Sequence, residues 1–178
     1  RHRCPILSTG LHVDHYPMKL ATAQEIRNID RRAMREFGIP GPVLMENAAA
    51  AVAAEMERFF NGLDGVKIGI ICGKGNNGGD GLALARRLRV RGIPVRLALL
   101  APFAALTGEA KLNLAILRKT DVEVLPNASA KTLADVIGWA DILVDAVLGV
   151  GLGSPLKGNY ALAVELMNAA GRPVVAVD

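Results

Sequence analysis

Short aliphatic runs alternate with amphipathic stretches along most of this chain. Strands are predicted where such runs stop abruptly at polar or glycine residues, at about 66–72, 94–100, 121–125, 141–147 and 173–178. Helices are predicted from the capping box at Thr22 to Gly38, and at about 43–60, 79–91, 104–118, 130–138 and 159–170, the last capped by Asn159. Strands that alternate with helices imply right-handed crossovers. The pattern therefore predicts one α/β domain with a parallel sheet.

The first predicted strand runs directly into a glycine-rich loop, Gly73-Lys74-Gly75-Asn76-Asn77-Gly78-Gly79-Asp80-Gly81. Its spacing fits G-x-G-x-x-G between a strand and a helix. Glycines permit positive φ and close approach to a ligand, and free N–H groups at a helix start favour an anion. A phosphate-bearing ligand is the first hypothesis. A tight turn is the alternative, but it leaves the two asparagines and the aspartate unexplained.

Two expected nucleotide-binding features are missing from the sequence. The next strand ends in Leu97-Ala98-Leu99-Leu100-Ala101-Pro102, without the acidic residue that holds a ribose in NAD-dependent dehydrogenases. The P-loop pattern G-x-x-x-x-G-K-[ST] does not occur either. An ordinary dehydrogenase and a P-loop enzyme are therefore both disfavoured.

Aspartates follow two further predicted strands, at Asp145 and Asp178. Ligands of open α/β sheets bind at the carboxyl ends of the strands. Two aspartates near Asn77 would make an oxygen-rich pocket that suits a hard cation such as K⁺, Mg²⁺ or Ca²⁺ rather than zinc. For Asp145 alone, capping of its own loop would be the simpler interpretation. The segment 149–154 is a second candidate anion site, while Lys157 is expected to be an ordinary surface lysine.

Composition removes several classes of chemistry. The chain has 178 residues, is 51% hydrophobic and only 4% aromatic, and all three histidines lie within residues 1–17. Histidine-based triads and most zinc sites are therefore excluded from the body of the chain. The two cysteines predict no disulfide and a reducing, cytoplasmic compartment, with Cys72 as a buried small hydrophobe.

The net charge of +4 is modest. Its densest basic run extends from Arg86 to Arg96 without aromatic residues, which favours a solvated helix end over a nucleic-acid patch. No apolar run is long enough to span a bilayer. Residues 1–17 lack periodicity, and Met18-Lys19 looks like a natural start, so we expect 1–17 to be an irregular N-terminal extension of a domain at 18–178.

Four segments resemble a known family, the YjeF N-terminal domain family of NAD(P)H-hydrate epimerases. They are 41–48 (Gly-Pro-Val-Leu-Met-Glu-Asn-Ala), the glycine loop 73–81, 145–151 (Asp-Ala-Val-Leu-Gly-Val-Gly) and 175–178 (Val-Ala-Val-Asp), in the family's order. The resemblance implies a Rossmann-like three-layer α/β/α sandwich with a mainly parallel sheet, usually as a homodimer. It implies an isomerase that interconverts the R and S forms of hydrated NADH and NADPH (NADHX and NADPHX), with a fused or separate dehydratase as partner, and neither a nucleic acid nor a membrane.

The resemblance also implies the residues of the site. Substrate contacts would come from Asn76, Asn77, Gly78, Gly79, Asp80, Gly149, Val150, Gly151, Leu152, Gly153, Ser154, Pro155 and Asp178. One K⁺ per subunit would be held by Asn77 and Asp145. Inversion at C6 of the ring needs a proton carrier, for which Asp178 is the first candidate and Asp80 the second. Glu46 and Asn47 are assigned packing near the site only.

The family continues beyond this last aspartate, whereas the sequence ends at Asp178, so we expect a domain truncated at its C-terminus. The competing hypothesis is a non-catalytic module of the same fold that binds a nucleotide or an RNA-related partner. Retention of Asn77, Asp145 and Asp178 together favours the enzyme, because a scaffold could lose any of them.

Overall fold

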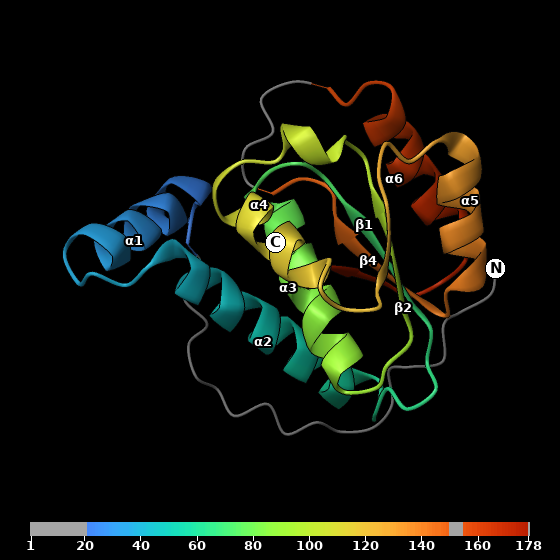
Figure 1. Cartoon of the computed structure of the whole chain (residues 1–178), viewed down its shortest axis with the longest axis horizontal. Helices are drawn as coiled ribbons and strands as arrows, with labels where there is room; N and C mark the ends of the chain where they lie inside the picture. The colour runs from blue at the N-terminus through green and yellow to red at the C-terminus, as the bar shows by residue number, and fades with distance from the viewer. Residues whose placement is uncertain (1–20, 150–154, 178) are drawn as a thin grey trace.

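A computed structural model describes residues 21–149 and 155–177 of the chain. Figure 1 shows a sheet with helices on both faces. Its strands are β1 (Ile68–Cys72), β2 (Val95–Leu99), β3 (Glu123–Leu125), β4 (Ile142–Ala146) and β5 (Val174–Ala176). Its helices are α1 (Ala23–Arg35), α2 (Gly41–Phe59), α3 (Asn76–Val90), the short 3₁₀ helix η1 (Phe103–Ala105), α4 (Gly108–Leu117), α5 (Ala130–Trp139) and α6 (Asn159–Ala169).

All pairings within this sheet are parallel, in the order β3-β2-β1-β4-β5. Each connection carries a helix, as a right-handed crossover requires. The strand order reverses between β1 and β4, where Cys72 lies opposite Ala146. In open α/β sheets this reversal opens a crevice at the carboxyl ends of the strands. The predicted α/β class and the three-layer Rossmann-like fold are thus confirmed.

The helices form two layers with different roles. Helices α2, α3 and α4 pack together on one face around an aliphatic core, while α5 and α6 cover the other (Figure 1). Strand β1 is buried along its whole length, as expected for the centre of a parallel sheet. Helix α1 begins at the predicted capping box, in which Thr22 and Glu25 bond reciprocally, and it contributes no buried residue. In Figure 1 it projects from the body beside α2.

Several predicted details of the elements are wrong, and β3 begins at Glu123, two residues later than predicted. Helix α3 begins at Asn76, three residues before the predicted start, so the loop after β1 is short. The predicted helix 104–118 is divided into η1 and α4 by extended backbone at Leu106. In the described part of the predicted strand 173–178, β5 covers Val174–Ala176. Asn159 does not cap α6: Gly158, with φ of 57°, holds that position, and the Asn159 side chain donates to the carbonyl of Ala128 instead.

None of the helices in the described part of the chain combines the length and apolar character that crossing a membrane requires.

Candidate functional site

The first turn of α3 stands at the end of β1 because two glycines allow very close backbone contact. A Cβ at Gly78 would overlap the carbonyl oxygen of Gly73, and a Cβ at Gly73 would overlap the carbonyl oxygen of Val147. Neither glycine has a positive φ. Of the two predicted reasons for these glycines, left-handed backbone is therefore wrong at both positions, and close approach to a ligand stays a prediction. They are required for space, which brings the ends of β1 and β4 against the start of α3.

The next two glycines seat α3 against its neighbours. A Cβ at Gly79 would lie 2.8 Å from Cε of Met45 on α2, and one at Gly81 would lie 2.7 Å from Sγ of Cys72. The first bond within the helix runs from the N–H of Gly79 to the carbonyl of Gly75. The N–H groups of the residues before Gly79 therefore have no acceptor within the helix and face the crevice, where they favour an anion.

A cleft of about 520 Å³ lies in front of this turn. It is lined by residues of α1, of the loop after β1, of the start of α3, and of the segments after β4 and β5: Ile26, Arg27, Asp30, Gly75, Asn76, Asn77, Asp80, Val147, Leu148, Gly149 and Val177. Four predicted site residues therefore share one cleft, namely Asn76, Asn77, Asp80 and Gly149. Its size and its mixed polar and apolar wall are typical of a small-molecule site.

Two carboxylates, those of Asp145 and Asp80, act electrostatically on Cys72 at the end of β1. Asp145, in β4, is half-buried, and its Oδ1 accepts a hydrogen bond of 2.9 Å from the N–H of Val147. Asp80 is half-buried in α3. Burial raises the pKa of the Cys72 thiol far above its ordinary value, and the negative charges of Asp145 and then Asp80 raise it further. Cys72 therefore stays protonated, which confirms that it is a buried small residue and not a nucleophile.

Asn77 and Asp145 can each offer an oxygen ligand of the kind that a hard cation prefers. Among the residues that the structure describes, the buried amide nitrogen of Asn77 finds no hydrogen-bond partner. Because amide nitrogen and oxygen are interchanged by a flip of the side chain, this position can equally present an oxygen. Asp145 uses one oxygen for the N–H of Val147 and keeps further lone pairs. In the described ranges no three Asp, Glu, His or Cys side chains converge as metal ligands, so such an ion would need amide and carbonyl oxygens as well.

The remaining predicted site residues fall into two groups. Val150, Gly151, Leu152, Gly153, Ser154 and Asp178 lie outside the described residues. Of the others, Gly78 and Gly79 are buried behind the cleft wall, Pro155 is exposed, and Lys157 is the exposed surface lysine that was expected.

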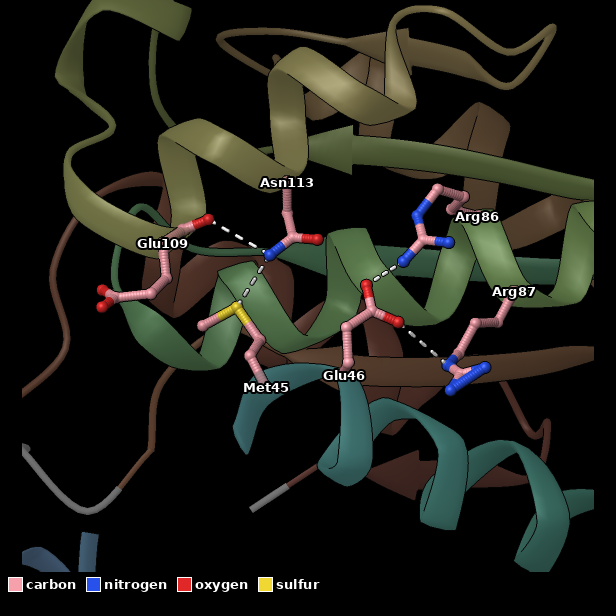
Figure 2. Close-up of polar contacts among 6 residues, drawn as sticks. All are labelled: Met45, Glu46, Arg86, Arg87, Glu109 and Asn113. Atoms are coloured by element: carbon pink, nitrogen blue, oxygen red, sulfur yellow. Dashed lines mark hydrogen bonds and ion pairs between the residues drawn. The ribbon is translucent and has the colours of Figure 1, made fainter. Parts of the chain in front are cut away.

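Glu46 ties α2 to α3 just behind the site. Its carboxylate pairs with Arg86 and, at 3.4 Å, with Nε of Arg87, as Figure 2 shows. These side chains are about one-fifth to one-third exposed, so the attraction is less screened than at the open surface. The packing role predicted for Glu46 is confirmed. For Asn47 it is wrong, because the helical turn places Asn47 on the exposed side of α2.

The arginines of the basic run form ion pairs with acidic residues of neighbouring elements. Besides Arg86 and Arg87, Arg89 pairs with Asp121, Arg91 with Glu57 and Arg96 with Glu123. Some of these arginines are half-buried, so the predicted solvated helix end is only partly right.

Sequence reasoning missed two contributions to the site. Asn113, only 2% exposed, donates from its amide nitrogen to Sδ of Met45 at 3.1 Å and to the carbonyl of Glu109 at 3.2 Å (Figure 2). Asn113 falls at the helical spacing of the buried positions of α4, and a polar residue at such a position was the signal that could have identified it. The three α1 residues in the cleft wall had no such signal, because the position of a helix on the body is not visible in its own pattern.

Most of the chain is similar in sequence to known proteins. The model of the family "YjeF-related protein N-terminus" matches residues 41–178. The "NAD(P)H-hydrate epimerase" of Limosilactobacillus fermentum is 38% identical over 157 residues, which cover 88% of this chain and 72% of that protein. The protein of the same name from Rhodopirellula baltica is also 38% identical, with 88% of this chain and 63% of that protein covered.

Longer relatives match as well. The "Bifunctional NAD(P)H-hydrate repair enzyme Nnr" of Moorella thermoacetica is 42% identical over 165 residues, and the match covers 90% of this chain but only 31% of that protein. Among solved structures, the crystal structure of the yeast protein ynu0 (YNL200c) superposes with a TM-score of 0.77 at 27% identity, covering 90% of this chain and 70% of that one. The matching family model, the shared fold and these relatives lead to one conclusion: the chain belongs to the YjeF-related protein N-terminus family.

Proposed function

We propose that this protein is an NAD(P)H-hydrate epimerase, an isomerase that interconverts the R and S forms of hydrated NADH and NADPH. The observation that carries the proposal is that Asn76, Asn77, Asp80 and Gly149 line one cleft at the reversal of strand order. Relatives at 38% identity bear the name of this activity. Hydrated nucleotides are the substrate class, and repair of damaged nicotinamide nucleotides is the role.

The phosphates of the substrate belong at the start of α3. The free N–H groups of its first turn and the helix dipole both favour an anion there. Gly149, which follows β4, lies in the wall of the cleft, and we assign further phosphate contacts to the segment 149–155 that it begins. A dinucleotide held this way needs no carboxylate at the end of β2, where the sequence offers none.

Inversion at C6 requires the C–O bond or the ring C–N bond to break and re-form, with a proton moved to and from the departing atom. A carboxylate at the cleft can carry that proton. We assign this role to Asp178 first and to Asp80 second. Asp80 lies in the cleft wall, and Val177, the neighbour of Asp178, lies there too.

Asn77 and Asp145 would hold one K⁺ per subunit. When bound, the ion supplies a fixed positive charge that holds the geometry of phosphate or carboxylate oxygens and takes no part in redox chemistry. The unpartnered amide of Asn77 and the free lone pairs of Asp145 support this assignment.

The test is a coupled assay on the full-length protein. R-hydrated NADH is mixed with a dehydratase that accepts only the S form, with and without K⁺, and the recovery of NADH absorbance is followed. We expect recovery well above the spontaneous rate, loss of about a hundredfold or more in Asp178→Asn, and a smaller loss in Asp80→Asn. A recovery rate equal to the blank, with the hydrate still bound, would favour the non-catalytic binding module.

We also propose a homodimer and a dehydratase partner, either fused or separate, in the cytoplasm. The large apolar side chains exposed along α1 and the turn to α2 support an assembly surface: Ile26, Ile29, Met34, Phe37, Ile39 and Val43. The names of the bifunctional relatives support the link to a second repair activity. Light scattering of the purified protein tests the dimer, and Phe37→Ser should shift the mass towards the monomer if this surface is the interface.

A further inference from the structure

A second, smaller cavity of about 190 Å³ opens beside the cleft. The two share three lining residues, Asp30 of α1 and Asn76 and Asp80 of α3. They are therefore parts of one site, and a ligand whose phosphates lie at the start of α3 can extend into the smaller cavity. This side cavity lies between α1, α2 and the starts of α3 and α4.

The wall of the side cavity has two chemical characters. Its apolar part consists of Met34, Leu44, Met45 and Ala48. Its polar part holds three carboxylates, those of Asp30, Asp80 and Glu109, and the amide of Asn76. An apolar surface accepts the face of a ring, whereas ionised carboxylates accept hydrogen bonds and repel a phosphate.

Most of this wall is fixed before any ligand arrives. The thioether of Met45 is held at 3.1 Å by the buried amide of Asn113, which also bonds to the backbone of Glu109 (Figure 2). Glu46, the residue after Met45 on α2, forms an ion pair with Arg86 on α3. Helices α2, α3 and α4 are thus tied together around the cavity. Such preorganisation is typical of a binding site. Because folding has already fixed these side chains, a ligand need not order them when it binds.

Helix α1 supplies the outer wall. Asp30 makes no hydrogen bond or ion pair with the residues that the structure describes. Glu109, by contrast, packs against the backbone of Gly41 at the start of α2, where its charge also suits the helix dipole. Among the described residues, Asp30 is therefore the carboxylate of this cavity to which the fold assigns no stabilising contact.

The two ends of a hydrated dinucleotide differ in how they suit such a wall. The hydrated nicotinamide ring offers three hydrogen-bond donors, two on its carboxamide nitrogen and one on its C6 hydroxyl group. Adenine offers two donors on its amino group, but its ring edge carries three acceptor nitrogens, and these gain nothing from a carboxylate. The ring that undergoes the reaction also needs a carboxylate nearby, and Asp80 lies where the side cavity meets the cleft.

We propose, on the basis of the function proposed above, that the side cavity is the subsite for the hydrated nicotinamide ring and that Asp30 is a specificity residue, which accepts hydrogen bonds from the donors of that ring. The apolar floor around Met45 takes the face of the ring. The adenine half of the substrate then lies in the larger cleft.

The test compares Asp30→Asn with the wild type in the full-length protein. Asparagine keeps the size and removes the charge, and α1 has no buried residue whose packing the change could disturb. Asp135→Asn, an exposed aspartate on α5 at the other face of the sheet, is the matched control. Binding is measured by calorimetry for hydrated NADH, for hydrated reduced nicotinamide mononucleotide, which lacks adenine, and for AMP, which lacks nicotinamide. Epimerase KM and kcat are measured alongside.

We expect Asp30→Asn to weaken binding of both hydrated nicotinamide compounds by about tenfold, to raise KM to the same extent with little change in kcat, and to leave AMP unaffected. Asp135→Asn should match the wild type. Weaker binding of AMP with unchanged binding of the hydrated mononucleotide would place adenine in the side cavity and overturn the proposal, as would no change for any compound. If the wild type binds the hydrates without turnover, the proposed function fails, and the binding series still decides where the ring lies.

Discussion

Individual glycines at the site act through the space they leave. The sequence pattern predicted the glycine loop, but the positive φ expected of its glycines is absent at Gly73 and Gly78. A local pattern cannot distinguish a left-handed residue from one that another part of the backbone touches. In the structure, Gly73 and Gly78 are contacted by carbonyl groups, whereas Gly75 has open space around its Cα. Two alanine substitutions three residues apart should therefore differ sharply.

Gly78→Ala should destabilise the fold by about 2 kcal/mol or more, since backbone atoms of Gly73 must move to admit the new methyl group. Gly75→Ala, also at the start of α3, should cost less than about 1 kcal/mol, the loss of a glycine cap. Thermal unfolding measures the cost of both variants. Equal costs for the two variants would contradict the close contact.

Cys72 provides a residue-scale prediction on pH. Burial raises the pKa of its thiol, so the folded protein keeps the proton while the unfolded thiol ionises near its ordinary value of 9.0. Stability is therefore unaffected by this group below that pH and falls as the pH rises above it. In a Cys4→Ser variant, iodoacetamide should label Cys72 at least about a hundredfold more slowly in the native protein than in urea at pH 8. Rapid labelling of the native protein would show that the thiol is accessible.

At the scale of elements, the site depends on how α3 is seated. Its first three residues, Asn76 to Gly78, lie before the predicted start of the helix, and asparagine and glycine have low helix propensity. Tertiary contacts override that propensity, with Met45 covering Gly79 and Glu46 bound to Arg86. The helix pattern of α4 likewise hid the role of Asn113, which becomes visible only when α2 and α4 are brought together.

Glu46→Gln should therefore cost about 1–3 kcal/mol of unfolding free energy, because it leaves two partly buried arginines without their carboxylate. Glu55→Gln on the same helix removes an exposed pair with Arg58 and should cost less than about 0.5 kcal/mol. Urea denaturation of both variants gives the comparison. A cost for Glu46→Gln no larger than that of the control would mean that α2 and α3 are held by apolar packing alone.

At the scale of the whole molecule, the alternation of strands and helices was enough to predict which chain segments meet. Parallel strands place their carboxyl ends at one edge, so the loops after β1 and β4 had to converge, and they do. The strand order and the reversal between β1 and β4 were not visible in the sequence. Nor was the place of α1, whose apolar residues gave its helical period but not the neighbour against which it lies. The sequence therefore predicted the floor of the site and missed its outer wall.

The central claim is that this cleft catalyses inversion at C6 of a hydrated nicotinamide ring. Its most direct test is proton NMR of a sample enriched in R-hydrated NADH, with the full-length protein added and the separate C6 proton signals of the two forms followed in time. We predict that the mixture relaxes to its equilibrium ratio at a rate proportional to the protein concentration, and that Gly78→Ala slows it strongly whereas Asp135→Asn, on the other face of the sheet, does not. An R-to-S ratio that changes no faster than in buffer alone would contradict the claim.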